Sequence, residues 1–132
     1  MMIYLAGPIN GCTDEECNDW RAIARREFSL KLCAKSLDPM RRDYRGKEDE
    51  SVNEIVQLDK LDVERCDMIL AACPKPSVGT SMEIFYAWTL GKPVYAVVPD
   101  GAPVSPWLRY HSTRICSTFE EAIQAVREAV QQ

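Results

Sequence analysis

Carboxylates are the side chains of this sequence best placed to do chemistry, because histidine is almost missing. His111 is the only histidine, and it lies in the polar stretch 110–113, where we expect a surface position. No Gly-x-Ser-x-Gly elbow accompanies it, so a Ser-His-Asp triad is not supported. A single histidine also cannot complete a zinc site that needs two. We therefore expect acid–base chemistry to come from carboxylates, tyrosine or cysteine.

Glu83 follows the stretch Gly79-Thr80-Ser81-Met82, at the beginning of a helix that we expect over residues 82–90. The helix dipole stabilises negative charge in a first turn, so it should hold Glu83 ionised. A fixed carboxylate there can stabilise or attack an oxocarbenium-like carbon. Thr80 and Glu83 also have the spacing of a capping box, in which Glu83 would only satisfy backbone N–H groups. The pattern leaves both interpretations open.

Two further residues can assist such a carboxylate. Asp59 lies on a preceding helix, where it is either a solvated acid or stands at the edge of the apolar face. Near Glu83 it would be the natural proton donor or acceptor, because paired acids in unlike environments take different roles. Tyr4 lies near the carboxyl end of the first strand. Its phenol either orients a catalytic carboxylate or belongs to a core aromatic with a satisfied hydroxyl.

These residues need a scaffold, and the pattern of apolar runs predicts one. Strands are expected at residues 2–6, 35–37, 67–73, 94–98 and 115–116. Capping boxes predict helices that begin at residues 13–16, 51–54 and 118–121. The strand runs are apolar without alternation, which favours a doubly wound α/β fold: a mainly parallel five-stranded sheet, flavodoxin- or Rossmann-like, with helices on both faces. Ligands bind beyond the carboxyl ends of such strands, at residues 7–12, 38–46, 74–83 and 99–107.

Composition narrows the class of protein. The 132 residues fit one domain over residues 1–132, and the net charge of −4 disfavours binding to a nucleic acid polymer. No apolar stretch approaches the ~20 residues of a membrane span, so we expect no membrane partner. Six cysteines without a Cys-x-x-Cys pair or a signal peptide indicate reduced thiols in a cytoplasmic protein.

Two loops have sequences that bear on phosphate binding. The loop after residue 6 lacks both Gly-Lys-Ser/Thr and Gly-x-Gly-x-x-Gly, so nucleoside triphosphate hydrolysis and dinucleotide binding are poorly supported. The loop over residues 38–46 contains Arg41, Arg42 and Arg45. These arginines can meet a phosphate, or they form an ordinary solvated run of charge.

Three segments resemble one known family. Residues 3–9 (IYLAGPI) are similar to the opening strand and loop of nucleoside 2-deoxyribosyltransferases. Asp59, followed by the strand at 67–71, resembles that family's Asp-bearing helix and central strand. Residues 77–87 (SVGTSMEIFYA), followed by Gly-Lys-Pro at 91–93, resemble its nucleophile segment. The resemblance covers nearly the whole chain.

The resemblance implies an enzyme that cleaves the N-glycosidic bond of 2′-deoxynucleosides and transfers deoxyribose to another nucleobase, with net retention. Glu83 would be the nucleophile and form a covalent deoxyribosyl-enzyme. Asp59 would protonate the leaving base, Tyr4 would hold Glu83 in line, and Asp43 would face the base. The matched loops imply further substrate-binding residues, which are Gly7, Pro8, Asn10, Ser77, Gly79, Met82, Ser105 and Trp107.

The same resemblance implies partners and excludes cofactors. The carboxylates supply both nucleophile and acid–base group, so we expect no metal and no cofactor. The expected partners are a small nucleoside or nucleotide and a free nucleobase. Family members are dimers or larger, so we expect a homodimer or higher homo-oligomer in which residues 105–107 complete a neighbour's site.

Two departures from the transferases keep alternatives open. At Ser77 those enzymes carry an acid, whereas Ser77 and Ser105 look like the related 2′-deoxynucleoside 5′-phosphate N-hydrolases, where such serines bind phosphate. Those hydrolases, however, have Ser and Arg where this chain has Pro8 and Asn10. The alternatives are hydrolysis of a 5′-monophosphate and, from another class, a non-catalytic nucleotide sensor.

Overall fold

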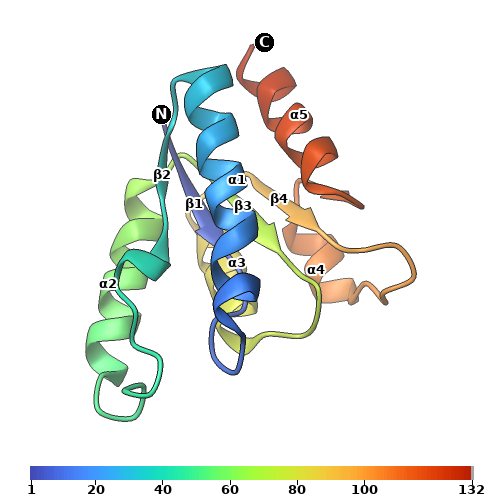
Figure 1. The fold of residues 1–132 in the computed structure, drawn as a ribbon. Coiled ribbons are helices and arrows are strands. Elements are labelled where there is room, and N and C mark those ends of the chain that lie inside the picture. The colour runs from blue at the N-terminus through green and yellow to red at the C-terminus, as the bar shows by residue number, and fades with distance from the viewer. Residues whose placement is uncertain (132) are drawn as a thin grey trace.

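Five parallel strands form the centre of the chain in a computed structural model that describes residues 1–131 (Figure 1). The strands are β1 (Met2–Ala6), β2 (Lys35–Leu37), β3 (Met68–Ala72), β4 (Val94–Val97) and β5 (Arg114–Cys116). Their order in the sheet is β2-β1-β3-β4-β5, and every pair is parallel. This arrangement confirms the predicted doubly wound α/β fold.

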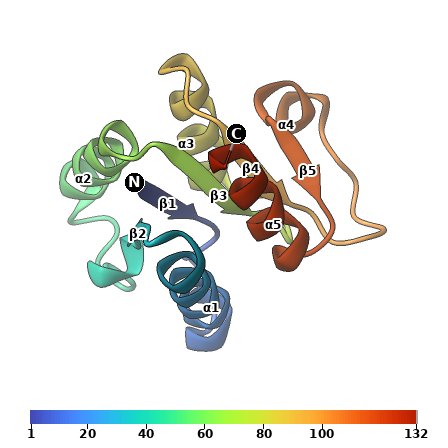
Figure 2. The same ribbon diagram turned by 90° about the horizontal axis from the view of Figure 1, so that it is seen from above.

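Helices cover both faces of the sheet. They are α1 (Asp14–Leu32), α2 (Val52–Arg65), α3 (Val78–Thr89), α4 (Pro106–His111) and α5 (Phe119–Val130), with a short 3-10 turn, η1 (Pro39–Arg41), after β2. Figure 2, which looks onto the sheet from above, shows α1 and α5 on one side and α2, α3 and α4 on the other. None of the helices within residues 1–131 is long and apolar enough to span a membrane.

Alternate residues of β1 point into two separate cores. Ile3 and Leu5 pack with the α1 and α5 side chains, whereas Tyr4 packs with Val63 of α2 and Ile84 of α3. Full burial of such side chains stabilises the fold by about 1.5–3 kcal/mol each. The alternation fixes the phenol of Tyr4 on the face that α2 and α3 cover.

The helix beginnings follow the sequence only in part. Thr13 and Glu16 form the reciprocal capping box predicted for α1. The box predicted at residues 51–54 is wrong, because Ser51 makes no side-chain cap. At residues 118–121 only half of a box forms, since the Glu121 carboxylate accepts from the Ser117 N–H instead. These helices therefore depend more on packing against the sheet than on their caps.

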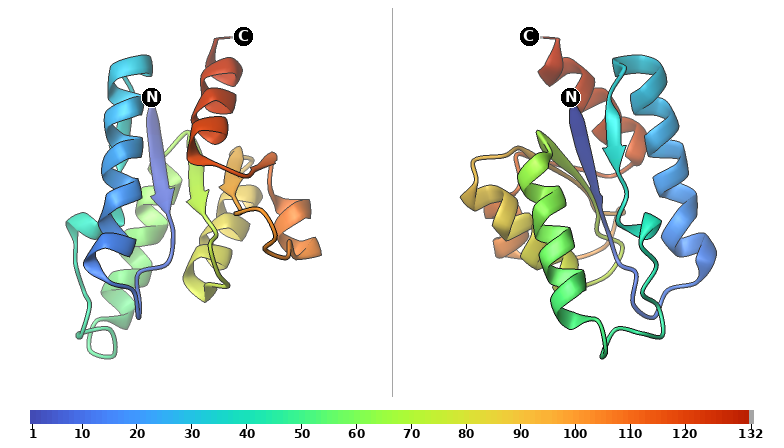
Figure 3. Two further views of the ribbon diagram at one scale, coloured as in Figure 1. Left: turned by 45° about the vertical axis from the view of Figure 1, so that its right-hand side comes forward. Right: turned by 90° about the vertical axis from the view of Figure 1, so that its left-hand side faces the viewer.

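The β1–β3 boundary is where the site must be sought. Chain connections leave β1 and β3 in opposite directions along the sheet, which makes this the topological switch point of the fold. In Figure 3 the loops after β1 and β3 lie at one edge of the molecule, and the N-terminus lies at the other. A Cβ on Gly7 would lie 2.7 Å from a ring carbon of Trp20, so this turn requires glycine.

Candidate active site

Glu83 and Tyr4 meet on the α2/α3 face of the sheet. Ser77 caps α3 by accepting from the Thr80 N–H at 3.3 Å, so α3 begins at Val78 and Glu83 lies in its second turn. The expected first-turn position and the capping box of Thr80 with Glu83 are both wrong for this reason. The half-buried Glu83 carboxylate instead accepts a hydrogen bond from the fully buried Tyr4 hydroxyl.

The environment of Glu83 favours its protonated form. Burial raises the pKa of Glu83 to about 8, and the negative charge of Asp59 adds to this, while the hydrogen bond from Tyr4 lowers it in part. The expectation that the helix dipole holds Glu83 ionised at neutral pH is therefore wrong. Burial and the Glu83 charge also raise the pKa of Tyr4, which stays a hydrogen-bond donor.

Asp59 reaches the same site from α2. Its side chain is half-buried, and burial raises its pKa, against the opposing effect of Arg42. Helix α2 packs directly against α3, and the charge of Asp59 acts on both Glu83 and Tyr4. Asp59 is thus not a freely solvated helix acid.

The arginines after β2 pair with acids of α2. Asp62, only 2% exposed, accepts at 2.8 Å from Arg41 Nη2 on one oxygen and at 2.8 Å from Arg42 Nη2 on the other. Burial alone would raise the pKa of Asp62, but the two arginines hold it below its ordinary value. The sequence offered no reason to give Asp62 a role. Both arginines are therefore paired with an acid of α2, although Arg41 is exposed, and a role of either in binding phosphate stays a prediction.

Asp43 is held by a different arginine. Arg45 binds both of its oxygens, with Nη2 at 2.7 Å from Oδ2 and Nε at 3.0 Å from Oδ1. Hydrogen bonds from Arg45 lower the pKa of Asp43 to about 2. Within residues 1–131 Asp43 makes no hydrogen bond to Tyr4, Asp59 or Glu83. The expected role in facing the base stays a prediction.

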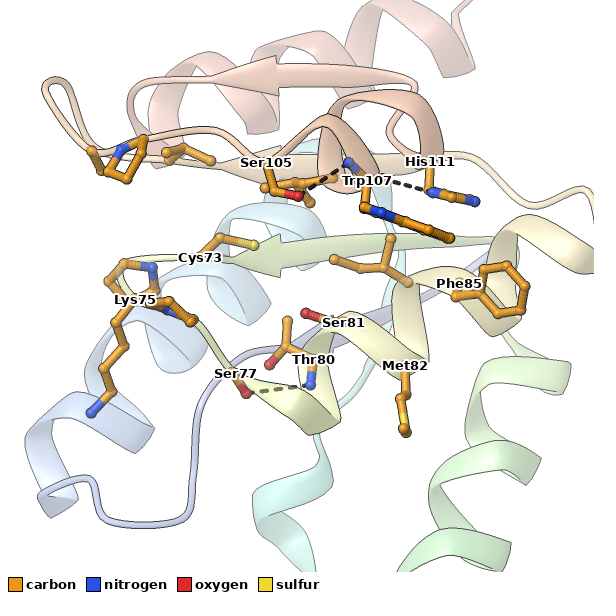
Figure 4. A pocket seen from close by; sticks show the side chains of 17 residues that line it. Cys73, Lys75, Ser77, Thr80, Ser81, Met82, Phe85, Ser105, Trp107 and His111 are labelled. Atoms are coloured by element: carbon orange, nitrogen blue, oxygen red, sulfur yellow. Dashed lines mark hydrogen bonds between the residues drawn. The ribbon is translucent and has the colours of Figure 1, made fainter.

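A cavity of about 620 Å³ lies between α3 and α4 (Figure 4). Four of the predicted substrate-binding residues line it, namely Ser77, Met82, Ser105 and Trp107. In Figure 4, Ser77 and Ser81 of α3 lie across the cavity from Ser105 and Trp107. Tyr4, Asp59 and Glu83 are not among its lining residues, so the predicted site residues form two neighbouring groups within one chain.

The remaining predicted residues lie outside this cavity. Pro8 lines a second cavity of about 420 Å³ on the α1/α5 side of the sheet edge. Gly7 is buried in the turn after β1, and Asn10 and Gly79 are exposed. Gly7, Pro8 and Asn10 lie in the loop after β1, whereas Gly79 lies in the first turn of α3 and not in a loop. Contact of these residues with substrate stays a prediction.

The profile of one protein family, nucleoside 2-deoxyribosyltransferase, matches residues 3–128. The chain belongs to this family. Its membership makes it an enzyme of the glycosyl-transferring, N-glycosidic bond-cleaving type. None of the curated protein sequences matches the chain.

Solved structures of similar fold include proteins of known activity at low sequence identity. A 2-deoxyribosyltransferase of Bacillus psychrosaccharolyticus is 17% identical with a TM-score of 0.76, and 96% of each chain is covered. A 2-deoxyribosyltransferase of Leishmania mexicana is 20% identical with a TM-score of 0.65, covering 96% of this chain and 97% of that one. A CMP N-glycosidase of Clostridium botulinum is 16% identical with a TM-score of 0.61, covering 96% and 98%.

Arg21 positions β1 of this deoxyribosyltransferase-family chain, although the sequence analysis missed it. Its fully buried guanidinium donates to the carbonyls of Leu5, Gly7 and Cys17 at 3.2, 2.9 and 2.6 Å. The Arg21 Nε lies 3.7 Å from Asp38 Oδ1. These contacts fasten the carboxyl end of β1 and so help to place Tyr4. A lone arginine in a helix gives no sequence signal for such burial.

His111 is buried, so its expected surface position is wrong. It is 8% exposed and its Nδ1 lies 2.6 Å from the Trp107 carbonyl. Its ring makes edge contacts with Phe85 and Trp88 of α3 and with Tyr110. The packing of α4 on α3 explains the burial.

An exposed apolar surface surrounds His111 on this family member. We call it the aromatic patch, and it consists of Met82, Phe85, Trp88, Trp107 and Tyr110. Trp107 and Tyr110 are 73% and 71% exposed. Large exposed apolar patches of this kind mark surfaces that meet a partner.

No group of three or more potential metal ligands occurs in the described part of the chain, residues 1–131. All six cysteines are unpaired there. Burial raises the pKa of both Cys66 and Cys73 to about 11, so these thiols are poor nucleophiles.

Proposed function

We propose that the chain cleaves the N-glycosidic bond of 2′-deoxynucleosides and transfers the deoxyribose, through a covalent intermediate on Glu83, to a second nucleobase. The observation that carries the proposal is the hydrogen bond from the buried Tyr4 hydroxyl to Glu83, with Asp59 on the adjacent helix. Two carboxyl groups in unlike environments suit a nucleophile and a proton donor.

In the first half of the reaction a carboxylate oxygen of Glu83 bonds to C1′. The C1′–N bond breaks, its electron pair passes to the base nitrogen, and Asp59 gives that nitrogen or a conjugated one its proton. In the second half the acceptor nitrogen attacks C1′, Asp59 takes up the acceptor's proton, and Glu83 is released as a carboxylate. Two inversions give net retention. Tyr4 holds the attacking carboxylate in line.

The second candidate is hydrolysis of a 2′-deoxynucleoside 5′-monophosphate. It is favoured by the hydroxyl groups of Ser77 and Ser105, which line the cavity between α3 and α4. The structural similarity to a CMP N-glycosidase is compatible with it. A non-catalytic sensor, the third candidate, would have no need for the Tyr4–Glu83 contact.

One experiment separates these candidates. The protein is incubated with deoxynucleosides or with their 5′-monophosphates, each with and without a second free base, and products are separated by chromatography. Base exchange from nucleosides supports the transferase, whereas release from monophosphates alone supports the hydrolase. No release from either substrate contradicts both. Glu83→Ala should abolish turnover, with Glu50→Ala, at an exposed loop position, as the matched control.

We also propose that the chain works as one cytoplasmic domain and as a homodimer or higher homo-oligomer. The unpaired thiols fit a reducing compartment. The aromatic patch borders the cavity, so a second copy seated on it would bring its own residues 105–107 near this site. Such an arrangement would build the substrate-binding part of each site from two chains.

A further inference from the structure

Arg42 lies between the two carboxylates of α2 at the site. Its Nη2 donates to Asp62 Oδ2 at 2.8 Å and reaches Asp59 Oδ1 at 3.4 Å. Arg41 occupies the other oxygen of Asp62. Because Asp62 is buried and engaged by both arginines, it fixes the orientation of Arg42 from the core side.

One donor of Arg42 has no hydrogen-bond partner among the described residues. Its Nε is buried and makes no hydrogen bond within the described chain. The Nε–H and Nη2–H groups of a guanidinium point the same way and match the two oxygens of a carboxylate. An unpaired buried donor costs about 1–3 kcal/mol. Nη2 already reaches Asp59 at 3.4 Å, and the unpaired Nε–H lies on the same side of the guanidinium, so one donor of this pair is left over for a carboxylate.

We propose that Arg42, held by Asp62, is a positioning residue whose Nε–H and Nη2–H close as a two-point fork on Asp59 when Asp59 gives its proton to the leaving base. The inference rests on the proposed function, since it takes Asp59 as the proton donor. As the C1′–N bond breaks and the proton moves to the base, Asp59 becomes an anion. Arg42 then supplies two charge-assisted hydrogen bonds to it, and reprotonation by the acceptor base opens the fork again.

The charge balance around Asp59 fits this role. The positive charges of Arg41 and Arg42 offset the negative charges of Asp59 and Asp62, so the cluster is neutral when Asp59 is ionised. The groups that act on Asp59 come from four segments, and they are Tyr4 of β1, Asp62 of α2, Glu83 of α3, and Arg41, Arg42 and Tyr44 of the β2–α2 segment.

Two substitutions should change the acidity of Asp59 in opposite directions. Arg42→Gln removes the group that lowers the pKa of Asp59 and leaves the charge of Asp62 less compensated, so the pKa should rise by about one pH unit. Asp62→Asn removes a repelling charge and releases Nη2 to Asp59, so the pKa should fall. If the two substitutions only disturbed the local packing, they would not shift the pKa of Asp59 in opposite directions.

The test is a carboxyl carbon NMR titration of Asp59, assigned with Asp59→Asn, in the unliganded wild type and both variants. Arg41→Gln is the matched control, because Arg41 binds the same buried acid but not Asp59. We expect a rise for Arg42→Gln, a fall for Asp62→Asn and a much smaller change for Arg41→Gln. Thermal unfolding checks that each variant is folded. If Asp62→Asn does not fold, Arg42→Lys is titrated in its place, and it should raise the pKa of Asp59 by less than Arg42→Gln does.

Turnover then tests the catalytic part. Arg42→Gln should lower kcat for base release about 10–100-fold with little change in KM, and Arg42→Lys should recover part of it. An unmoved Asp59 titration in Arg42→Gln, equal effects of Arg41→Gln, or movement of both variants in one direction would overturn the proposal. Absence of base release by the wild type would instead reject the proposed function, and the titration would still report on Arg42.

Discussion

The two carboxyl groups of the site have opposite requirements. Attack needs Glu83 ionised, yet burial raises its pKa to about 8, whereas Asp59 must be protonated, and burial raises its pKa although Arg42 opposes part of that rise. The working form of the enzyme is the one in which Glu83 is ionised while Asp59 is still protonated. The fraction of enzyme in that form is what the surrounding side chains control.

The first prediction is the pH dependence of kcat/KM. Below the pKa of Asp59, added acid only protonates Glu83, so activity falls. Between the two pKa values, the ionised fraction of Glu83 rises with pH as fast as the protonated fraction of Asp59 falls, so activity is constant. Above about pH 8 Glu83 is already ionised while Asp59 goes on losing protons, so activity falls again. Base release measured from pH 4 to 10 should therefore give a bell with its alkaline limb near pH 8.

Tyr4→Phe should move that alkaline limb. It removes a hydrogen bond that lowers the pKa of Glu83, so the limb should shift above pH 8, and the rate on the plateau should fall about 10–100-fold. Tyr86→Phe is the matched control, because its hydroxyl binds the exposed Glu64 and not Glu83. A profile unchanged from wild type in Tyr4→Phe would contradict the assigned contact.

Glu83→Gln should be more stable than the wild type at alkaline pH. The folded-state pKa of Glu83 lies above its ordinary value. The stability that protonated Glu83 contributes to the fold is therefore fully present below about pH 4.5 and is lost as the pH rises through about 8. We expect similar free energies of unfolding at pH 5 and an advantage of roughly 2–4 kcal/mol for Glu83→Gln at pH 9. Denaturant titration measures both, with Glu50→Gln as the exposed control.

At the scale of elements, the sequence predicted which helices and strands occur better than how they begin. Apolar runs predicted the three inner strands β1, β3 and β4, because strands in a parallel sheet that is buried on both faces must be apolar. The short edge strands β2 and β5 are only partly buried and gave a weaker signal. The beginning of α3 was missed by four residues, because Ser77 caps it and the Gly79 that seemed to precede the helix lies within it. That error changed the expected charge state of Glu83.

The side chains that position the site were the least predictable. Arg21 and Asp62 are buried charges whose partners come from distant segments, and no local pattern marks them. Tyr4 was left open between core and site, and the structure shows both a buried ring and an engaged hydroxyl. The predicted surface position of His111 was wrong, because its polar neighbours in the sequence gave no sign that its ring packs on α3.

The turn between β1 and α1 gives a prediction for element packing. A Cβ on Gly7 would meet Trp20 at 2.7 Å and Ala72 at 3.3 Å, so Gly7→Ala should destabilise the fold by about 1–3 kcal/mol. Gly79→Ala is the matched control, because its Cβ would meet nothing within 4 Å inside α3, and we expect it to be slightly stabilising. Thermal unfolding of both variants measures the difference, and equal stabilities would contradict the packing role of Gly7.

At the scale of the whole molecule, a second copy of the chain would explain two features. It would cover the aromatic patch, and it would complete the cavity next to the patch. Tyr110 is 71% exposed in the patch, and Leu30 is 70% exposed on α1 away from it. Tyr110→Glu would bury a charge in a self-association surface, so it should shift a dimer to monomers, whereas Leu30→Glu should not. Light scattering after gel filtration at tens of micromolar measures the mass. If residues 105–107 complete a neighbour's site, base release should fall together with the dimer in Tyr110→Glu and persist in Leu30→Glu; a fully active wild-type monomer would contradict the shared site.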